Sequence, residues 1–539
     1  MLLNGIDWAV IAAFFAILAL IPFVASLRSK RTANDFFTSG RSMPWWLIGF
    51  SMVAATTATD SANFFTEVIR RDGMSGNWVM WAFILTGLLT VFVYAKLWVR
   101  SGVSTDIEFY ELRYSGRPAV FLRAFRTLYL GVVFNVLVLG NVILAAVKIG
   151  VILFGIEPST IYVVTIVASV VYTFFGGIRG VIWTDFFLFL VIMAGAVAAM
   201  VYGLELPEVG GIAGIVSNPE TANRLSILPD FSDWNTLVPV FVIPLAVQWW
   251  NVWKAGSEPG GGGYIVQRML TAKSDAHALG GTLFFNVLNW VIRPWPWYVV
   301  GLCSVLVYPD LASIQAAFPN VDPSLVQGDM AYPAMLTKVP NGWLGVVAAS
   351  MMGALFSTVA AHLNLGSAYM VNDFWKRFVR PKASDRELIW IGRSSMLLLL
   401  LLGCIIAPHL KSAKGAFDLM LLIGAGSGAI FLLRWFWMRI NAWTEIAGMG
   451  VSFVVAIIMQ CCYGHFEPWK KMLVTIAITS VSWLAVTFLT KPTDEATASR
   501  FKAAVRAKGR DVGKGVLYTA LSAFAIFFLM WAVGAVLFR

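Results

Sequence analysis

Charged side chains are scarce in this chain. Only 13% of its 539 residues are Asp, Glu, Lys or Arg, whereas soluble domains carry about a quarter. No stretch of soluble-domain composition and no linker rich in Pro, Ser or Gln interrupts the sequence. The composition therefore excludes a soluble globular protein, and we expect residues 1–539 to form a single membrane-embedded domain.

Cysteines and catalytic motifs are sparse as well. The four cysteines, Cys303, Cys404, Cys461 and Cys462, show neither the CxxC nor the Cys/His spacing of redox or zinc sites. The HExxH, GxSxG and P-loop signatures are missing too. We therefore expect neither a disulfide framework nor enzyme activity.

Hydrophobic runs of about 20 residues recur instead, each long enough to cross roughly 30 Å of hydrocarbon as a helix. A transmembrane β-barrel would show alternation over about ten residues rather than continuous runs. The pattern predicts an all-α polytopic membrane protein. We expect about fourteen transmembrane helices, near residues 8–27, 43–70, 76–100, 122–153, 158–175, 181–203, 236–256, 276–308, 343–372, 388–408, 415–436, 441–463, 470–490 and 514–538.

The net charge of +11 follows membrane topology rather than a polyanionic ligand. Lysine and arginine cluster in alternate loops, near residues 28–41, 100–126, 376–386 and 500–514. The loops 204–235 and 309–342 are poor in both. Because cytoplasmic loops carry the basic excess, we expect both termini outside a plasma (inner) membrane. The lipid bilayer is the expected partner, with no nucleic acid and no obligatory protein partner.

Two segments contain residues that disfavour a continuous helix. Ala54 to Ser61, in the second predicted span, are all small or polar, and "EPGGGGYIVQR" (258–268) adds a proline and four glycines after the seventh. Irregular backbone at membrane depth is tolerated where it is buried in protein or lines a cavity. Close helix packing at the first segment and a plain loop at the second are the alternatives.

The spacing of these segments predicts a transporter. The two segments lie five helices apart in the predicted order, and paired interruptions in corresponding positions indicate a binding site built from inverted repeats. We expect the repeats to be residues 43–203 and 236–436, with breaks near Ala54–Ser61 and Trp253–Gly263. The first helix would then be peripheral, and residues 441–539 would form three C-terminal helices.

Ionisable residues inside predicted spans are costly and therefore functional candidates. They are Asp60, Glu67, Lys148, Asp185, Arg293, His362 and Asp418. For each, a structural pair or a helix end at the membrane interface is the alternative. Arg293 would bind a carboxylate bidentately, although a structural role is the favoured interpretation.

Five motifs follow one another in a familiar order: "FFTSGRSMPWW" (36–46), "STDIEFYELRY" (104–114), "YTFFGGIRGVIWTDFF" (172–187), "YIVQRMLTAKS" (264–274) and "GALFSTVAAHLN" (353–364). With them, nearly the whole chain resembles the sodium:solute symporter family, which includes the sodium/glucose and sodium/galactose cotransporters. The resemblance implies a LeuT-type five-plus-five inverted repeat with flanking helices. It also implies sodium-driven uptake by alternating access, without an organic cofactor.

The resemblance also implies a sodium site. Its ligands would be the backbone carbonyls of Ala54, Thr57 and Ala354 and the hydroxyls of Ser357 and Thr358. A broken helix supplies free carbonyls, which suit a small hard cation.

Some family members hold a second sodium ion with an aspartate and two further serines. The aspartate corresponds to Asp185, a candidate coupling residue, but Ala360 and Ala361 replace the serines. We therefore expect one sodium ion per cycle.

The solute is less defined. The positions that grip sugars in relatives correspond to Ser61, Met80, Gly262 and Asn289, none of which keeps the sugar-binding residue type. Tyr264 matches the aromatic residue that closes over the solute; Trp81 and, at the outer edge, Asp418 complete the expected pocket. Aromatic faces suit sugar rings but also apolar or cationic solutes.

We expect a sodium-coupled symporter for a small polar organic solute, with sugar-like solutes favoured. A carboxylate or an amino acid is the alternative that Arg293 raises. A membrane-embedded solute sensor is the alternative from another class, and it would be recognised by a fused signalling domain.

Overall fold

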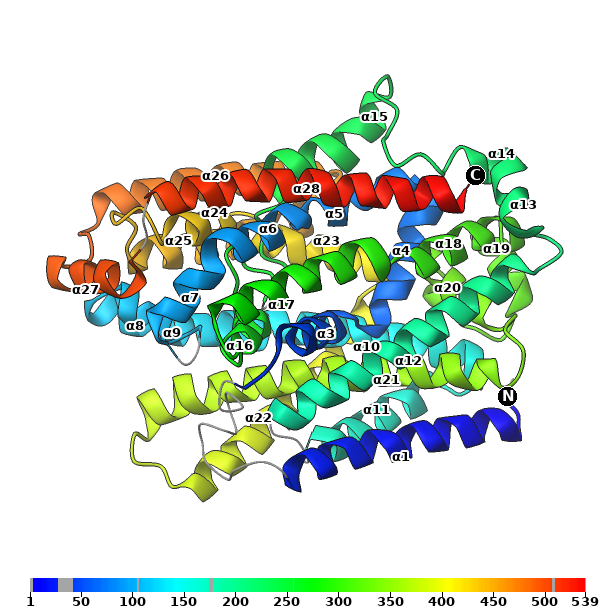
Figure 1. Cartoon of the computed structure of the whole chain (residues 1–539), viewed down its shortest axis with the longest axis horizontal. Coiled ribbons are helices and arrows are strands. Elements are labelled where there is room, and N and C mark those ends of the chain that lie inside the picture. The colour runs from blue at the N-terminus through cyan, green and yellow to red at the C-terminus, as the bar shows by residue number, and fades with distance from the viewer. Residues whose placement is uncertain are drawn as a thin grey trace.

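The computed structural model describes residues 3–27, 42–103, 106–173, 178–254, 256–506 and 509–538. Apart from one bridge between Met43 and Ala272, the regular structure of these residues is helical. Most long helices run along one direction of the molecule (Figure 1). The prediction of an all-α fold is confirmed. The basic cluster near residues 28–41 lies outside the described residues.

The helices follow the predicted order. In the first half they are α1 (Gly5–Leu27), α3 (Trp45–Thr56), α4 (Thr59–Asp72), α5 (Trp78–Trp81), α6 (Phe83–Leu89), α7 (Ala95–Ser101), α8 (Phe109–Arg113), α9 (Gly116–Leu128), α10 (Asn135–Phe154), α11 (Pro158–Thr173), α12 (Ile178–Leu204), α13 (Gly211–Ser217), α14 (Pro219–Ala222) and α15 (Trp234–Leu237). In the second half they are α16 (Gly263–Met269), α17 (Asp275–Val287), α18 (Trp295–Val307), α19 (Leu311–Ala317), α20 (Ala331–Leu336), α21 (Trp343–Ala368), α22 (Asp385–Ile406), α23 (Ala413–Gly424), α24 (Gly428–Leu433), α25 (Ala442–Cys462), α26 (Pro468–Leu489), α27 (Glu495–Val505) and α28 (Gly509–Leu537). π-helical stretches continue several of them, at Thr90–Tyr94, Tyr129–Phe134, Val238–Val242, Pro244–Gln248, Leu288–Ile292 and Tyr369–Val379.

Helical structure is present in every predicted span. Among the described residues, nine helices are long and apolar enough to cross a membrane, and three shorter apolar helices, Gly5–Ile21, Trp45–Thr56 and Trp234–Gln248, add to them. The total of fourteen crossings stays a prediction. The seventh span ends earlier than expected, because helical structure stops at Gln248 and resumes only at Gly263.

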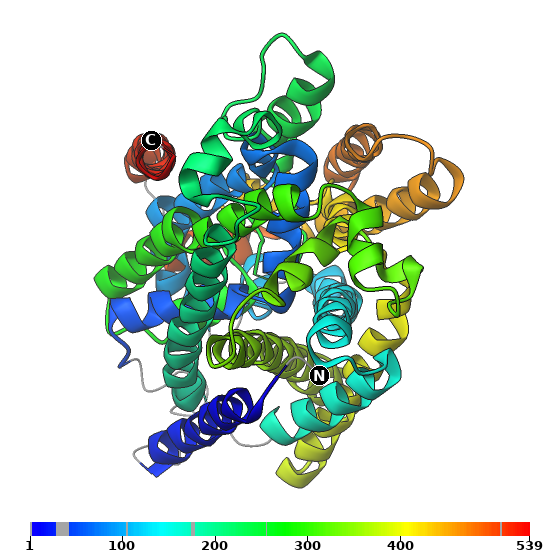
Figure 2. The ribbon, with the colours of Figure 1, turned by 90° about the vertical axis from the view of Figure 1, so that its right-hand side faces the viewer.

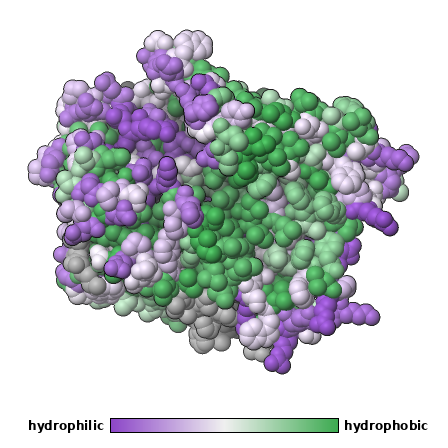
Figure 3. Space-filling view, turned by 180° about the vertical axis from the view of Figure 1, so that it is seen from behind, coloured by the Kyte–Doolittle hydropathy of each residue, from purple (hydrophilic) through white to green (hydrophobic). Residues whose placement is uncertain are grey.

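The helices form a buried centre and an apolar rim. In the segment Gly116–Phe154, 89% of the most apolar stretch is buried, whereas in Asp385–His409 and Asp511–Leu537 only 22% is. Seen end-on, α1 and α28 lie at the periphery (Figure 2). From behind, a hydrophobic band separates two hydrophilic ends (Figure 3). The exposed apolar rim fits the hydrocarbon of a bilayer.

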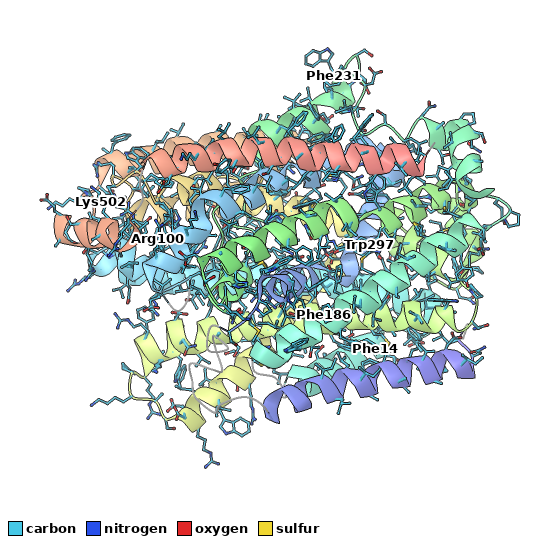
Figure 4. The ribbon with its side chains drawn as sticks, in the orientation of Figure 1. Phe14, Arg100, Phe186, Phe231, Trp297 and Lys502 are labelled. Carbon is cyan, nitrogen blue, oxygen red and sulfur yellow. The ribbon has the colours of Figure 1, made fainter. Side chains whose placement is uncertain are left out.

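Both chain ends lie at one end of the molecule, near α13, α14 and α19 (Figure 1). Arg100 and Lys502 lie at the opposite end (Figure 4). The loops that are poor in basic residues and those that are rich in them are therefore separated along the long axis, as a positive-inside topology requires. Which end faces the cytoplasm stays a prediction.

Candidate functional site

Threonines end the first half of the second span. α3 stops at Thr56, Thr57 and Ala58 are non-helical, and α4 begins at Thr59. The hydroxyls of Thr56 and Thr57 both donate to the carbonyl of Val53, at 2.8 and 2.7 Å. Side-chain hydroxyls that compete for backbone carbonyls weaken a helix. The predicted interruption near Ala54–Ser61 is thus confirmed as a break of two residues.

The second break is longer and covers the described residues 249–254 and 256–262. Its glycines are needed where the backbone is left-handed: Gly260 and Gly261 have φ angles of 85° and 92°, which favour glycine. A Cβ atom on Gly260 would also come within 3.0 Å of the Tyr94 ring. The run of glycines therefore lets an irregular loop pass closely between packed helices.

Side chains satisfy the polar groups of this loop. Trp98 donates its indole N–H to the carbonyl of Gly260 at 2.7 Å. The hydroxyl of Ser257 accepts from two backbone N–H groups of the loop at 3.0 Å. Glu258 accepts from the N–H of Gly256 at 2.6 Å and pairs with buried Arg126 at 2.9 Å. Such satisfaction is what makes irregular backbone tolerable at membrane depth.

A cavity lies where the two breaks meet. It encloses about 1180 Å³ including its opening. Its lining includes Thr56 and Ala58 at the first break and Trp253 and Gly261 in the second. Its lining is mostly apolar and aromatic with a few polar and charged side chains, which is typical of small-molecule sites. The cavity is therefore the candidate transport site.

Aromatic rings cover the cavity on the α4 side. Phe64, Phe83 and Trp253 surround Phe417, with ring centroids 5.2, 6.5 and 5.2 Å from that of Phe417. On the α16 side, the ring of Tyr264 meets that of His362 at 6.2 Å. In Figure 1, α4 lies nearer the end with the chain termini and α16 nearer the basic end. The cavity thus has an aromatic wall towards each end.

Three charged side chains line the cavity without pairing with one another: Asp60, Lys254 and Arg293. The Lys254 ammonium lies 4.4 Å from the centre of the Trp253 ring. Asp60 accepts from the Asn141 amide at 2.5 Å.

Arg293 donates from Nη1 to the Thr56 carbonyl at 3.2 Å and to the Thr57 hydroxyl at 3.0 Å. Arg293 thus braces the first break and also lines the cavity.

The helices that carry the predicted sodium ligands pack together at the first break. α21 packs against both α3 and α4, and Thr59 donates to the Met351 carbonyl at 3.3 Å. Thr358 lines the cavity, and its buried hydroxyl has no hydrogen-bond partner among the described residues. The carbonyl of Ala54 accepts one bond, from the N–H of Thr57 at 3.0 Å. A carbonyl oxygen has two lone pairs, so Ala54 keeps one for an ion.

Asp185 borders the same place. Its carboxylate accepts from Ser357 at 3.2 Å and from Ser51 at 2.6 Å. It also pairs with the Arg268 guanidinium at 3.0 Å. Ser51 lies on α3, Asp185 on α12, Arg268 on α16 and Ser357 on α21, so this cluster joins four helices.

The predicted solute residues divide into two groups. Ser61, Met80, Tyr264 and Asn289 line the cavity, whereas Trp81, Gly262 and Asp418 do not.

The prediction was wrong for the three residues that do not line the cavity, and each has a physical reason. Trp81 is fully buried and donates its indole N–H to the Tyr298 hydroxyl at 3.0 Å. Gly262 lies against the Glu258 carboxylate, and its neighbour Gly261 faces the cavity instead. Asp418 pairs with Lys414 at 2.7 Å and lines a separate cavity.

Lys254 was not among the residues expected from the sequence. The only signal for it was its position, a single basic residue in an apolar span just before the glycine run. Thr86 was missed as well: its hydroxyl donates to the Trp249 carbonyl at the start of the second break.

The fold and the site define a multi-pass membrane transporter, not an enzyme. The model of the sodium:solute symporter family matches residues 36–451, and the chain belongs to this family.

Relatives and a solved structure agree with this assignment. The chain is 26% identical to the sodium/glucose cotransporter of Vibrio parahaemolyticus over 501 residues, covering 89% of each chain. It is 25% identical to the human sodium/myo-inositol cotransporter 2, covering 88% of this chain and 76% of the relative. The structure of a Na⁺-coupled sialic acid symporter superposes with a TM-score of 0.71 at 20% identity, covering 91% of this chain and 99% of that one. The likeness confirms the expected LeuT-type fold.

Proposed function

We propose that the protein is a sodium-coupled secondary active symporter that imports a small polar organic solute, sugar-like, by alternating access. One observation carries the proposal: a single cavity is lined by both helix breaks and by Thr358 of α21. Solute and ion would thereby contact the same two helix breaks. The names of similar proteins include cotransporters of glucose, mannose and myo-inositol, which favours a sugar-like solute.

The sodium ion, a co-transported substrate, would be held at the first break. Its ligands are the carbonyls of Ala54, Thr57 and Ala354 with the hydroxyls of Ser357 and Thr358. The unpartnered Thr358 hydroxyl supports this assignment, because a buried hydroxyl without a partner is otherwise costly.

Ion binding would bias the conformational cycle. The proposed repeats, residues 43–203 and 236–436, contribute α3 and α21 respectively, and the ion would hold these two helices together. Release of the ion towards the cytoplasm frees them to move apart, and a ligand that favours one conformation shifts the population towards it. We also propose that both termini lie outside a plasma (inner) membrane, because the loops rich in basic residues lie at the opposite end of the molecule (Figure 4).

We assign one sodium ion to each cycle. Asp185 is the carboxylate that a second ion would use, but its charge is already compensated by Arg268. Ala360 and Ala361 also lack the hydroxyls that a second ion would need.

A carboxylate-bearing solute is a second candidate within the same function. Lys254 and Arg293 both line the cavity, and cationic side chains there suit an anionic group.

The experiment is thermal unfolding of the purified protein with sodium or potassium chloride, against a panel of sugars, sugar acids and amino acids. A ligand that binds the native state raises the unfolding temperature. We expect at least one solute to stabilise the protein far more in sodium than in potassium. Equal stabilisation in both salts across the panel would contradict sodium coupling.

A further inference from the structure

We propose that the solute is a sugar acid, whose carboxylate binds between Lys254 and Arg293 while its hydroxyls meet the polar wall of the cavity. The inference rests on the proposed function and narrows its substrate class. It comes from the charges of the cavity lining and from polar atoms there that lack partners.

The cavity carries an excess of positive charge. Four charged residues line it: Asp60, Lys254, Glu258 and Arg293. Glu258 is neutralised by Arg126 at 2.9 Å, which leaves two cations against the single carboxylate of Asp60. An uncompensated charge inside a membrane protein is costly. An anionic solute offsets this charge, whereas a neutral sugar leaves it in place.

Lys254 is positioned to receive that anion. The residue is only 8% exposed, and among the described residues its ammonium has no hydrogen bond and no ion pair. The faces of Trp253 and Tyr264 flank the ammonium at 4.4 and 5.7 Å from the ring centres. These rings hold the charge without satisfying its three N–H donors.

Arg293 supplies the second cation. One of its terminal nitrogens is used by Thr56 and Thr57, and its Nε atom is buried without a partner among the described residues. A guanidinium has five N–H donors in a fixed plane. Arg293 therefore keeps donors for a carboxylate while it braces the first break.

The remaining wall favours a hydroxylated acid over a plain one. The side-chain oxygen of Asn141, which lines the cavity, is buried without a hydrogen-bond partner in the described structure. An unpartnered acceptor is costly when buried, and a solute hydroxyl would supply the missing donor. Asp60 accepts further hydroxyls, and the ring of Trp253 suits the face of a sugar.

The test measures binding of matched probes to the purified full-length protein, in sodium chloride and in potassium chloride, by the shift in unfolding temperature. The probes are D-glucuronate, D-galacturonate and D-gluconate, with D-glucose and myo-inositol as neutral counterparts and L-serine as a zwitterion. Because a bond to a charged group contributes more than a neutral one, we expect the best acid to bind roughly 10- to 100-fold more tightly than D-glucose.

Three variants test whether Lys254 causes the preference for the acid. Lys254→Met removes the charge and should erase the preference for the acid, whereas Lys254→Arg keeps the charge and should retain most of it. Lys471→Met is the matched control: Lys471 is equally buried, at 7% exposure, but bonds Gln460 away from the cavity. Its binding profile should equal that of the wild type.

The outcomes separate the two proposals. Sodium-dependent binding of D-glucose or myo-inositol as tight as that of the acids, unchanged in Lys254→Met, overturns the sugar-acid inference and leaves the symporter intact. Binding of L-serine without binding of any sugar acid also overturns it. Binding of the acids that is independent of sodium contradicts the proposed function but upholds the carboxylate site.

Discussion

Replacing Thr358 with valine removes a single hydroxyl, and its effect on stability should reverse with the salt. The hydroxyl is buried and has no hydrogen-bond partner among the described residues. Without sodium, its loss removes a desolvated polar group, so the variant should be as stable as the wild type or up to about 1 kcal/mol more stable. With sodium, the variant lacks one of five proposed oxygen ligands. A loss of about 1.4 kcal/mol there lowers sodium affinity roughly tenfold.

Thermal unfolding in potassium and in sodium chloride measures both effects. At a sodium concentration of about 100 times the wild-type dissociation constant, sodium stabilises the wild type by about 2.7 kcal/mol and the variant by about 1.4 kcal/mol. Ser350→Ala is the control on the same helix, because the Ser350 hydroxyl donates to the Val347 carbonyl at 2.7 Å. It should keep the full sodium response. A full response in Thr358→Val, or a loss of several kcal/mol without sodium, would refute the reasoning.

Three further changes test the cavity and the second break. Tyr264→Ala should lower sodium-driven uptake, normalised to folded protein, more than it lowers the unfolding temperature; an equal loss of both would assign Tyr264 a packing role only. Glu258→Gln leaves the buried charge of Arg126 unpaired and should cost about 3–5 kcal/mol in chemical denaturation, so a change under about 0.5 kcal/mol would contradict the anchoring role. Gly260→Ala places a side chain on a left-handed backbone and should lower the free energy of unfolding by about 1–3 kcal/mol. The control Gly450→Ala on α25, with open space around it, should be neutral or stabilising. Equal effects of the two substitutions would argue against backbone strain at Gly260.

Much of the fold follows from local composition. Long apolar runs require helices, because only a helix satisfies its own backbone in lipid. The two breaks were predictable from local composition as well. The hydroxyls of Thr56 and Thr57 compete for backbone carbonyls, and Gly260 and Gly261 adopt backbone angles that favour glycine. Each of these causes lies within a few residues of its effect.

The composition of the cavity depended on contacts between distant segments. Lys254 lies inside the break expected near Trp253–Gly263, but only the folded loop shows that it lines the cavity. Asp418 was expected at the solute, but Lys414, one turn earlier on the same helix, pairs with it. The sequence contains that i,i+4 pair, but only the packing of the helix shows which cavity it faces.

Equilibrium binding of radioactive ²²Na⁺ to the purified protein tests the central claim most directly, because it needs no knowledge of the solute. The account predicts saturable binding of one ion per chain. Binding should be lost in the Ser357→Ala, Thr358→Ala double variant and retained in Ser350→Ala. Undiminished binding in the double variant would place the ion elsewhere, and binding of two ions per wild-type chain would contradict the single site at the junction of α3 and α21.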